Sequence, residues 1–305
     1  MKSLYVSGLN FYRRALKRVP GLHPTLYWVG EQVIVPILER LLRFRTIPEG
    51  PLYWRLEMLL GQYDVETAFF FKRVIKPGMI CLDIGANIGY YTRLFAHLVG
   101  SQGCVIACEP HPVAHAFLRD NVQGLHNVKI LNLAVGDHEG TTLLYDVVAI
   151  GSAASSLALH QSKIEFAESL HQECYRHAST KSVCTYSVRV STVDNILSTL
   201  GIRGVDLVKI DVEGAELAVM KGMTKTLQQS PSAIIVFEIN PLALKSFNTD
   251  PDDLFKLLEG IGYKEFAILD REVQPFTPGE ESFQHLCNIL YKESASVNIV
   301  ARREK

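Results

Sequence analysis

The stretch from Met79 to Thr92 constrains the fold of this chain more than any other. Its sequence, MICLDIGANIGYYT, passes from a short apolar run through two glycines into a helix-like pattern. This pattern predicts a buried strand, a tight turn and the start of a helix. Gly85 and Gly89 have no Cβ, so the backbone can turn sharply there and approach a ligand closely. Because ligands of open α/β sheets bind beyond the carboxyl ends of the strands, the stretch predicts a ligand-binding turn in an α/β fold.

A second apolar run ends in an acid twenty residues after Gly89. Val105–Cys108 leads directly into Glu109, and a carboxylate in this place suits the hydroxyl groups of a ribose. A dinucleotide fingerprint has three glycines spaced G-x-G-x-x-G, whereas this turn has Gly85 and Gly89 with Asp83 before them. An anionic side chain repels a pyrophosphate and attracts an ammonium or a sulfonium. The pattern therefore favours S-adenosylmethionine over a nicotinamide dinucleotide, and a turn that binds no ligand is the alternative interpretation.

Strand-like and helix-like patterns alternate from about residue 62 onward, which predicts a mostly parallel sheet. The alternation is interrupted over about residues 136–190. A turn at Gly136–Gly140 followed by a strand-like run at Thr141–Val147 predicts a β-hairpin there, and residues 158–183 are polar without a clear strand. The expected strands are 80–84, 105–108, 128–133, 141–147, 188–190, 205–210, 233–237, 266–269 and a last strand region over 283–291.

Four blocks of the sequence carry a resemblance to a known family. They are Lys76–Gly78 with Asp83–Thr92, Glu109–Pro110, Asn132–Gly140, and Val205–Glu216 together with Val236–Pro241. On these blocks the chain resembles the FkbM-type S-adenosylmethionine-dependent methyltransferases, between about residues 63 and 292. The resemblance implies an α/β, doubly wound, mostly parallel seven-stranded Rossmann-like sheet whose final strand runs antiparallel. The β-hairpin insertion and an N-terminal helical segment are expected as additions to that core.

The resemblance also implies which residues bind the cofactor. Thr92 is expected to hydrogen-bond the methionine carboxylate of S-adenosylmethionine, and the end of the third strand is expected to line the edge of the adenine. The cofactor-binding residues implied in this way are Asp83, Gly85, Ala86, Asn87, Gly89, Thr92, Glu109, Pro110, Ala134 and Val135.

Acidic residues follow the fourth and fifth expected strands, where an acceptor would bind. Methyl transfer from a sulfonium is an in-line displacement, so an enzyme must align the acceptor and remove the proton of an acceptor hydroxyl. Asp211 and Glu238 end adjacent strands, so both can point into one cleft. Glu213 is the third candidate catalytic residue, although a carboxylate at a helix start also offsets the helix dipole. Lys209 and Asn240 lie beside these acids in the sequence.

Two roles are open for the acidic pair. The acids can act as a general base and a clamp for the acceptor. Alternatively, oxygen atoms of Asp211, Glu238 and Asn240 can hold a Mg²⁺ that orients a diol, since hard oxygen ligands suit this ion. No spacing in the sequence distinguishes the two.

The histidines and cysteines give weaker signals. His111 and His115 lie one helical turn apart, and a packing or solvated face is the simpler interpretation, with a border of the adenine pocket as the alternative. Three further histidines, at positions 160, 171 and 177, fall in the polar insertion and offer a base on a lid. The six cysteines form no C-x-x-C pair, so neither a zinc site nor a disulfide framework is expected. A reducing, cytoplasmic setting fits best.

The N-terminal segment differs in charge from the rest of the chain. The whole chain has a formal net charge of -1, yet residues 1–45 hold eight basic residues against Glu31 and Glu39, a net charge of +6. No small-residue cleavage site follows a clean apolar core, so we expect no signal peptide. Glu31 and Pro36 interrupt the apolar runs, so we expect no membrane span. Residues 1–60 are therefore expected to form a helical cap, a dimerisation surface or a membrane-surface segment, and residues 61–305 the catalytic domain.

The function expected from these observations is methyl transfer to a hydroxyl of a sugar, a glycolipid or another small molecule. The near-zero net charge gives no reason to expect nucleic acid as a partner. Two other functions stay open: a catalytically silent cofactor-binding or membrane-associated protein, and, less favoured, an NAD-dependent oxidoreductase. The acidic cleft does not choose among carbohydrate, lipid, polyketide and protein acceptors.

Overall fold

The structure is a computed structural model that describes residues 22–48, 50–147, 157, 183–269, 273–293 and 295–304. Contacts between residues divide the chain into two compact units, Met1–Tyr63 and Asp64–Lys305. The three histidines at 160, 171 and 177 lie outside the described residues, as does nearly all of the polar insertion. Among the described residues, no helix has both the length and the apolar character needed to cross a bilayer.

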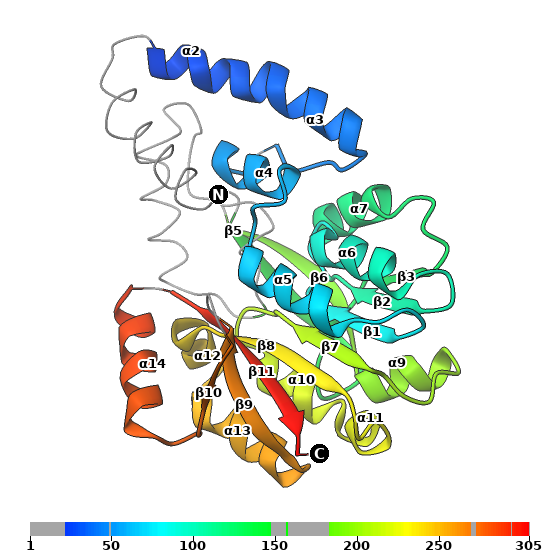
Figure 1. The fold of residues 1–305 in the computed structure, drawn as a ribbon, viewed down its shortest axis with the longest axis vertical. Helices are drawn as coiled ribbons and strands as arrows, with labels where there is room; N and C mark the ends of the chain where they lie inside the picture. Colours follow the sequence, from blue (N-terminus) through cyan, green and yellow to red (C-terminus); the bar gives the residue numbers. More distant parts are fainter. Residues whose placement is uncertain are drawn as a thin grey trace. The chain divides into compact units, whose positions relative to one another are not determined.

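The first unit is helical throughout its described part. A continuous helical rod (Figure 1) contains a π-helical turn at its centre and ends at Arg43, whose φ of 50° is left-handed. A loop then leads to one further helix. The elements are α2 (Leu22–Val29), the π-helical turn η2 (Gly30–Ile34), α3 (Val35–Leu42) and α4 (Leu52–Leu59).

The second unit is built on a sheet of the order β10-β9-β11-β8-β7-β1-β2-β3. Five neighbouring strands, β8-β7-β1-β2-β3, are parallel, and β11 runs antiparallel between β8 and β9. The mostly parallel sheet with an antiparallel final strand is thus confirmed. The strands are β1 (Ile80–Ile84), β2 (Cys104–Cys108), β3 (Val128–Leu131), β7 (Leu207–Ile210), β8 (Ile234–Ile239), β9 (Tyr263–Leu269), β10 (Val273–Phe276) and β11 (Val297–Arg303).

Two details of this sheet differ from expectation. Within the described residues it has eight strands rather than seven, because β10 pairs antiparallel with β9 at the edge. The expected last strand over 283–291 is wrong, since α14 (Glu281–Glu293) occupies that region and β11 follows it. Phe283, Leu286 and Cys287 are at positions i, i+3 and i+4, so they lie on one helical face, and this face packs against the core.

Helices cover both faces of the sheet, as a doubly wound fold requires (Figure 1). On one face Phe71 of α5 packs edge-on against Phe95 of α6, with ring centroids 4.7 Å apart. On the other face Phe237 of β8 packs near Phe255 of α13, at 6.0 Å. The helices of this unit besides α14 are α5 (Val65–Val74), α6 (Tyr90–Val99), α7 (Pro112–Asn121), α9 (Val193–Thr199), α10 (Glu216–Lys221), α11 (Thr224–Gln229), α12 (Pro241–Ser246) and α13 (Pro251–Gly260).

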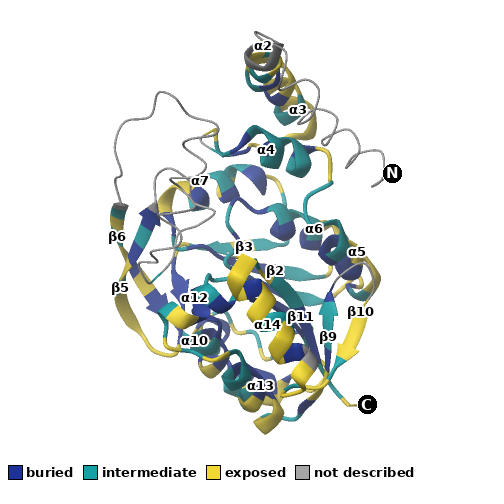
Figure 2. Ribbon diagram, turned by 90° about the vertical axis from the view of Figure 1, so that its left-hand side faces the viewer, coloured by how far each residue is buried: buried dark blue, intermediate teal, exposed yellow. Residues whose placement is uncertain are grey.

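A small second sheet of order β4-β6-β5 is formed by the insertion. β5 (Gly140–Val147) pairs antiparallel with β6 (Val183–Ser191), and β4 (Ala134–Val135) pairs parallel with β6. The expected hairpin across the turn at Gly136–Gly140 is therefore wrong, because the partner of β5 is a strand more than thirty residues further along the chain. Figure 2 shows buried residues along the strands and exposed residues on outer helices such as α13 and α14.

Candidate active site

The glycine turn between β1 and α6 is held between two neighbouring strands. The backbone N–H groups of Gly85 and Ala86 both donate to the carbonyl of Cys108 at the end of β2, each at 3.0 Å. A Cβ on Gly85 would lie 1.8 Å from the carbonyl oxygen of Asp211, just beyond β7. Gly85 also has a φ of +77°, which favours glycine. The turn is therefore fixed by backbone contacts on both sides.

Glu109 lies at the end of β2, next to this turn, and is only 7% exposed. Its Oε2 accepts a hydrogen bond from the N–H of Asn87 at 2.7 Å, and its Oε1 accepts one from the N–H of His111 at 2.8 Å. Burial raises the pKa of Glu109 to about 7, against the lowering effect of those two amides. Each carboxylate oxygen can accept a second hydrogen bond, so the side chain is oriented while keeping capacity for a ligand.

Asp83 is fully buried below the glycine turn. Its Oδ2 accepts a hydrogen bond of 2.5 Å from the Thr92 hydroxyl, and its Oδ1 lies 3.9 Å from Nζ of Lys209 without a hydrogen bond from any described residue. Burial raises the pKa of Asp83, and the Lys209 ammonium opposes this effect.

Thr92 is placed differently from the sequence expectation. Its hydroxyl is committed to Asp83, and its side chain has no exposed surface. It therefore orients a buried carboxylate, and the expected hydrogen bond to a methionine carboxylate is not available in this conformation.

The remaining cofactor candidates lie around the end of β3. Ala134 and Val135 form β4, pair with β6 and are buried. The carbonyls of Glu109 and Pro110 accept hydrogen bonds from the Asn132 side chain, at 2.8 and 3.1 Å. These bonds tie the residue after β3 to the end of β2, beside the ribose candidate.

Lys209 of β7 joins the cofactor candidates to the acids. Its Nζ lies 3.0 Å from Oδ2 of Asp211, 3.9 Å from Oδ1 of Asp83 and 5.1 Å from the centre of the Tyr91 ring. Burial lowers the pKa of Lys209, but the two carboxylates outweigh burial and raise it. The Tyr91 hydroxyl in turn donates to Asp64 at 2.6 Å. Neither Tyr91 nor Asp64 was predicted from the sequence as a site residue, although Tyr91 lies in the first turn after the glycines.

The three catalytic candidates come together at the carboxyl ends of β7 and β8. Each of Asp211, Glu213 and Glu238 offers an oxygen atom within 4.8 Å of the others, and all three are half-buried. Burial and then the charges of Asp211 and Glu213 raise the pKa of Glu238 well above its usual range. The hydroxyl of Ser296, which precedes β11, donates to Oε1 of Glu238 at 2.5 Å and opposes the rise.

The backbone conformation of Glu213 and the buried side chain of Glu216 together set the position of Glu213. Its φ of 57° is left-handed, which is uncommon for a residue with a side chain. Glu216 is almost fully buried, and its Oε1 accepts hydrogen bonds from the N–H groups of Val212 and Gly214, each at 3.2 Å. Burial raises the pKa of Glu216 to about 7. Glu216 therefore fixes the turn that presents Glu213.

Asn240 caps the helix that follows β8. Its Oδ1 accepts the N–H of Ala243 at 3.2 Å, at the start of α12. Glu213 lies with Asp211 and Glu238 as a further carboxylate that could contribute to a metal site. Carboxylate oxygens suit Mg²⁺, but the Lys209 ammonium already provides a positive charge at Asp211.

His111 is buried and has a structural role in this conformation. Its Nδ1 accepts the N–H of Ala114 at 3.3 Å, capping α7, so its Nε2 carries the proton and donates to Asp146 of β5 at 3.1 Å. Its ring also contacts Tyr186 of β6 edge-on, at 4.9 Å. These contacts fit the packing interpretation and attach the small sheet to α7.

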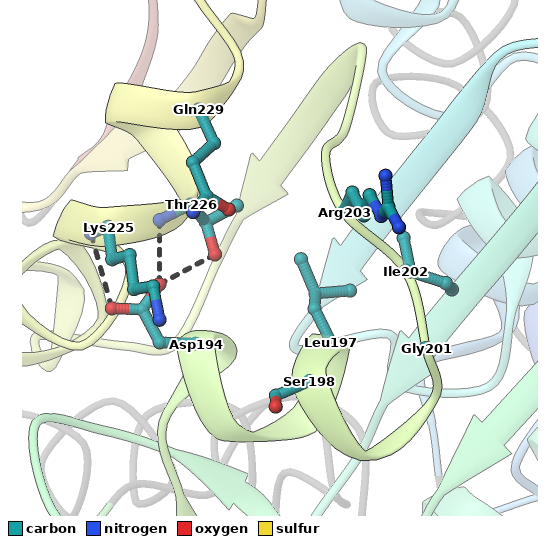
Figure 3. Close-up of a pocket in the computed structure, with 9 residues that line it drawn as sticks. All are labelled: Asp194, Leu197, Ser198, Gly201, Ile202, Arg203, Lys225, Thr226 and Gln229. Carbon is teal, nitrogen blue, oxygen red and sulfur yellow. Dashed lines mark hydrogen bonds between the residues drawn. The ribbon is translucent and has the colours of Figure 1, made fainter.

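A cavity of about 370 Å³ lies elsewhere in the second unit (Figure 3). It is bordered by α9, α11 and the loop at Gly201–Arg203, which precedes β7 and so lies at the end of the sheet away from Asp211. The carboxylate of Asp194 accepts hydrogen bonds from the N–H groups of Lys225 and Thr226 and from the Thr226 hydroxyl. Its polar group is thus used to hold α11, and the cavity contains none of the candidate catalytic residues.

A model of the methyltransferase FkbM domain matches residues 83–265 of this chain. The match runs from Asp83 through the glycine turn and Glu109 to the acids at β7 and β8.

Curated relatives agree with this match. The 2-O-methyltransferase NoeI of Sinorhizobium fredii is 28% identical over 158 residues, which are 51% of this chain and 61% of that protein. The hexuronic acid methyltransferase AglP of Haloferax volcanii is 27% identical over 213 residues, 70% of this chain and 74% of that protein. The 31-O-demethyl-FK506 methyltransferase FkbM of Streptomyces tacrolimicus is 31% identical over 163 residues, 49% of this chain and 61% of that protein.

The chain spans less than two thirds of the length of NoeI and of FkbM. The domain model nevertheless matches more than half of the present sequence. The chain belongs to the FkbM methyltransferase family.

Proposed function

We propose that this protein is an S-adenosylmethionine-dependent O-methyltransferase that methylates a hydroxyl group of a sugar, a glycolipid or another small molecule. The observation that carries the proposal is the contact between Gly85 and the Asp211 carbonyl, which places the glycine turn directly beside the acidic cluster. A cofactor over that turn and an acceptor at the acids would therefore be neighbours. The names of two relatives, a 2-O-methyltransferase and a hexuronic acid methyltransferase, support a carbohydrate hydroxyl as the acceptor.

The residues present fit S-adenosylmethionine. Gly85 lets the turn lie directly against the Asp211 carbonyl, where any Cβ would collide, and Glu109 retains hydrogen-bonding capacity for a ribose diol. The backbone of Ala134 and Val135 is assigned to the adenine edge. S-adenosylmethionine supplies an electrophilic methyl group on a positively charged sulfur.

On the acceptor side, Glu238 is assigned the role of general base. A carboxylate is a stronger base when its pKa is raised toward the working pH, and the pKa of Glu238 is raised by burial and by neighbouring acids. Glu238 takes the proton of the acceptor hydroxyl as the oxygen attacks. Asp211, paired with Lys209, and Glu213 hold the acceptor hydroxyls in line with the methyl group.

Calorimetric titration with S-adenosylmethionine, S-adenosylhomocysteine and NADH tests the cofactor assignment. We expect binding of the two sulfur compounds and none of NADH. A methyl-transfer assay with free sugars, hexuronic acids and glycolipids then tests the acceptor, with Glu238→Gln as the inactive control. Binding of NADH alone would overturn the proposal, as would an absence of binding of both sulfur compounds in the presence of each acceptor.

A chelator distinguishes the two roles considered for the acids. If Asp211 is neutralised by Lys209, activity persists when EDTA is added. If the acids hold a Mg²⁺, EDTA abolishes activity and added Mg²⁺ restores it.

A further inference from the structure

The helical rod of the first unit carries a line of apolar side chains on its outer side. Trp28, Val33, Ile37 and Leu41 are 60%, 40%, 53% and 73% exposed. Ile34 lies beside them and is 44% exposed. Large apolar side chains are seldom exposed in contiguous groups on a soluble surface, and such patches mark interaction sites.

The π-helical turn keeps these side chains in one line. Ile37 and Leu41 follow Val33 at intervals of four residues, which places all three on one face of an α-helix. Trp28 precedes Val33 by five residues, and Val33 belongs to the π-helical turn Gly30–Ile34. Because hydrogen bonds in a π-helix join residues five apart, the five-residue step across this turn returns to the same face.

The acidic residues of the rod face inward. Arg55 of α4 is 7% exposed and forms ion pairs with Glu31 and with Glu39, the latter at 3.5 Å. Thr46 donates its N–H and its hydroxyl to the same Glu39 oxygen, at 2.8 and 2.5 Å, and accepts a bond of 2.7 Å from Nε of Arg55. The two carboxylates of the rod are thus bound by Arg55 and Thr46 within the first unit, whereas the apolar side chains are exposed to solvent.

The exposed charged residues that border this apolar face, its rim, are basic. Glu31 and Glu39 are the only acids between residues 22 and 48. Arg40, Arg43 and Arg45 are exposed at the end of the rod, and Arg40 lies three residues after Ile37, next to the apolar line. An apolar face with a cationic rim and a tryptophan is complementary to an anionic bilayer surface.

We propose that the first unit binds the surface of an anionic lipid bilayer through an interfacial face formed by Trp28, Val33, Ile34, Ile37 and Leu41. In this arrangement the apolar side chains enter the boundary between headgroups and acyl chains, and the rim arginines contact anionic headgroups. A second copy of the chain fits this face less well, since pairing two such faces would bring two arginine rims together. The inference is independent of the proposed catalytic function.

Flotation of the full chain with vesicles tests the proposal. We expect binding to vesicles of phosphatidylcholine with phosphatidylserine, and weak binding to phosphatidylcholine alone. Ile37→Glu and Leu41→Glu should each weaken binding roughly tenfold or more, because each removes apolar burial and adds a repelled charge. Arg40→Gln should weaken it by roughly fivefold, and less at high salt. The matched control is Ile289→Glu on α14, another exposed isoleucine on a helix, which should leave binding unchanged.

Fluorescence gives a second measurement that does not depend on a disruptive substitution. The chain has two tryptophans, Trp28 and Trp54, so Trp54→Phe leaves Trp28 as the reporter. We expect its emission to shift to the blue with anionic vesicles and to be quenched by brominated acyl chains. Equal vesicle binding by Leu41→Glu and the unaltered chain would overturn the proposal. The proposal would also be overturned if the chain did not bind vesicles and instead formed a concentration-dependent dimer that Leu41→Glu disrupts.

Discussion

The two ends of the active site hold their carboxylates in contrasting ways. At the end of β2, both oxygens of Glu109 accept hydrogen bonds from backbone amides, and below the turn Asp83 accepts one from Thr92. At the ends of β7 and β8, Glu238 lies among other acids and accepts one hydroxyl bond, from Ser296. Hydrogen bonds from the backbone fix the position of Glu109, whereas repulsion between carboxylates dominates the environment of Glu238.

This difference indicates how each end responds to change. A carboxylate held by backbone donors is already oriented before a ligand binds, so the cofactor end is shaped in advance. Carboxylates that repel one another bind protons, cations or hydroxyl donors readily. The chemistry of the acceptor end therefore depends strongly on which groups and ions are bound there. Lys209 connects the two, since it contacts both Asp83 and Asp211.

The largest expected effect lies at the acceptor end. Glu238→Gln keeps the shape of the side chain and removes the base, so kcat should fall by about 10²- to 10⁴-fold while the affinity for S-adenosylmethionine is unchanged. Steady-state kinetics and calorimetry measure the two quantities separately. Glu265→Gln, which alters an exposed acid of β9, serves as the control. A loss of cofactor affinity in Glu238→Gln would break the division between the two ends.

The dependence of activity on pH tests the assignment of Glu238 as the general base. Because the base must be deprotonated to accept a proton, activity should rise with pH through the raised pKa of Glu238. The Ser296 hydrogen bond lowers that pKa, so Ser296→Ala should move the profile to higher pH. A profile that stays in place in Ser296→Ala would argue for a different base.

Lys209→Met removes the connection between the two ends. Asp83 is fully buried and would lose its counter-charge, and an uncompensated buried charge costs about 3 kcal/mol or more of the free energy of unfolding. Denaturant unfolding measures this loss. Adding Asp83→Asn should recover part of it, since the neutral amide needs no counter-charge. If the double variant is no more stable than Lys209→Met, the pair is not the source of the loss.

Glu216, the buried acid that fixes the turn presenting Glu213, should make the free energy of unfolding depend on pH. The pKa of Glu216 is raised from its usual 4.5 to about 7, so between these values the folded chain binds a proton that the unfolded chain has released. Its contribution is present below pH 4.5 and is lost as the pH rises toward 7. Glu216→Gln should flatten the fall in unfolding free energy over this range. An unchanged slope would exclude Glu216 as its origin.

At the cofactor end, Glu109→Gln should reduce the affinity for S-adenosylmethionine by roughly tenfold, through loss of charge-assisted hydrogen bonds to the ribose. The value of kcat at saturating cofactor should stay close to that of the unaltered chain. Calorimetry and kinetics with a common acceptor give both numbers. The opposite result, a lower kcat with full affinity, would place Glu109 in the chemical step.

The smallest effect concerns the backbone at the acceptor end. Glu213 has a left-handed φ of 57°, which asparagine adopts at lower cost. Glu213→Asn should therefore raise the free energy of unfolding by about 0.5 to 1 kcal/mol while activity falls. Glu213→Gln keeps the unfavourable conformation and should not gain stability. Equal stability of the two variants would show that repulsion among the acids, rather than backbone strain, dominates at this residue.

The cofactor end was the more predictable from sequence. Its parts lie within one stretch of the chain, from Asp83 to Glu109, and the glycine spacing reports a local backbone requirement. Contacts between distant residues gave no such signal: Ser296 reaches Glu238 across 58 residues, and Tyr91 reaches Asp64 across 27.

The other differences between prediction and structure arise where a short sequence pattern fits two local structures. A short apolar run such as Phe283–Tyr291 fits a strand or a helix about equally, and its packing against the core decides for the helix. Asn240 was grouped with the acids by its place after β8, whereas its side chain caps the helix that begins there. Asparagine is a strong helix cap, and the proline that follows it was an available signal.

The π-helical turn lets the first unit tolerate a change in chain length. A π-helical turn accommodates one residue more than an α-helical turn does, so deletion of one residue such as Gln32 would restore a regular α-helix. The step from Trp28 to Val33 would then fall from five residues to four, which keeps both side chains on one face of an α-helix. Related chains with a single-residue gap at this point should therefore present the same undivided apolar surface.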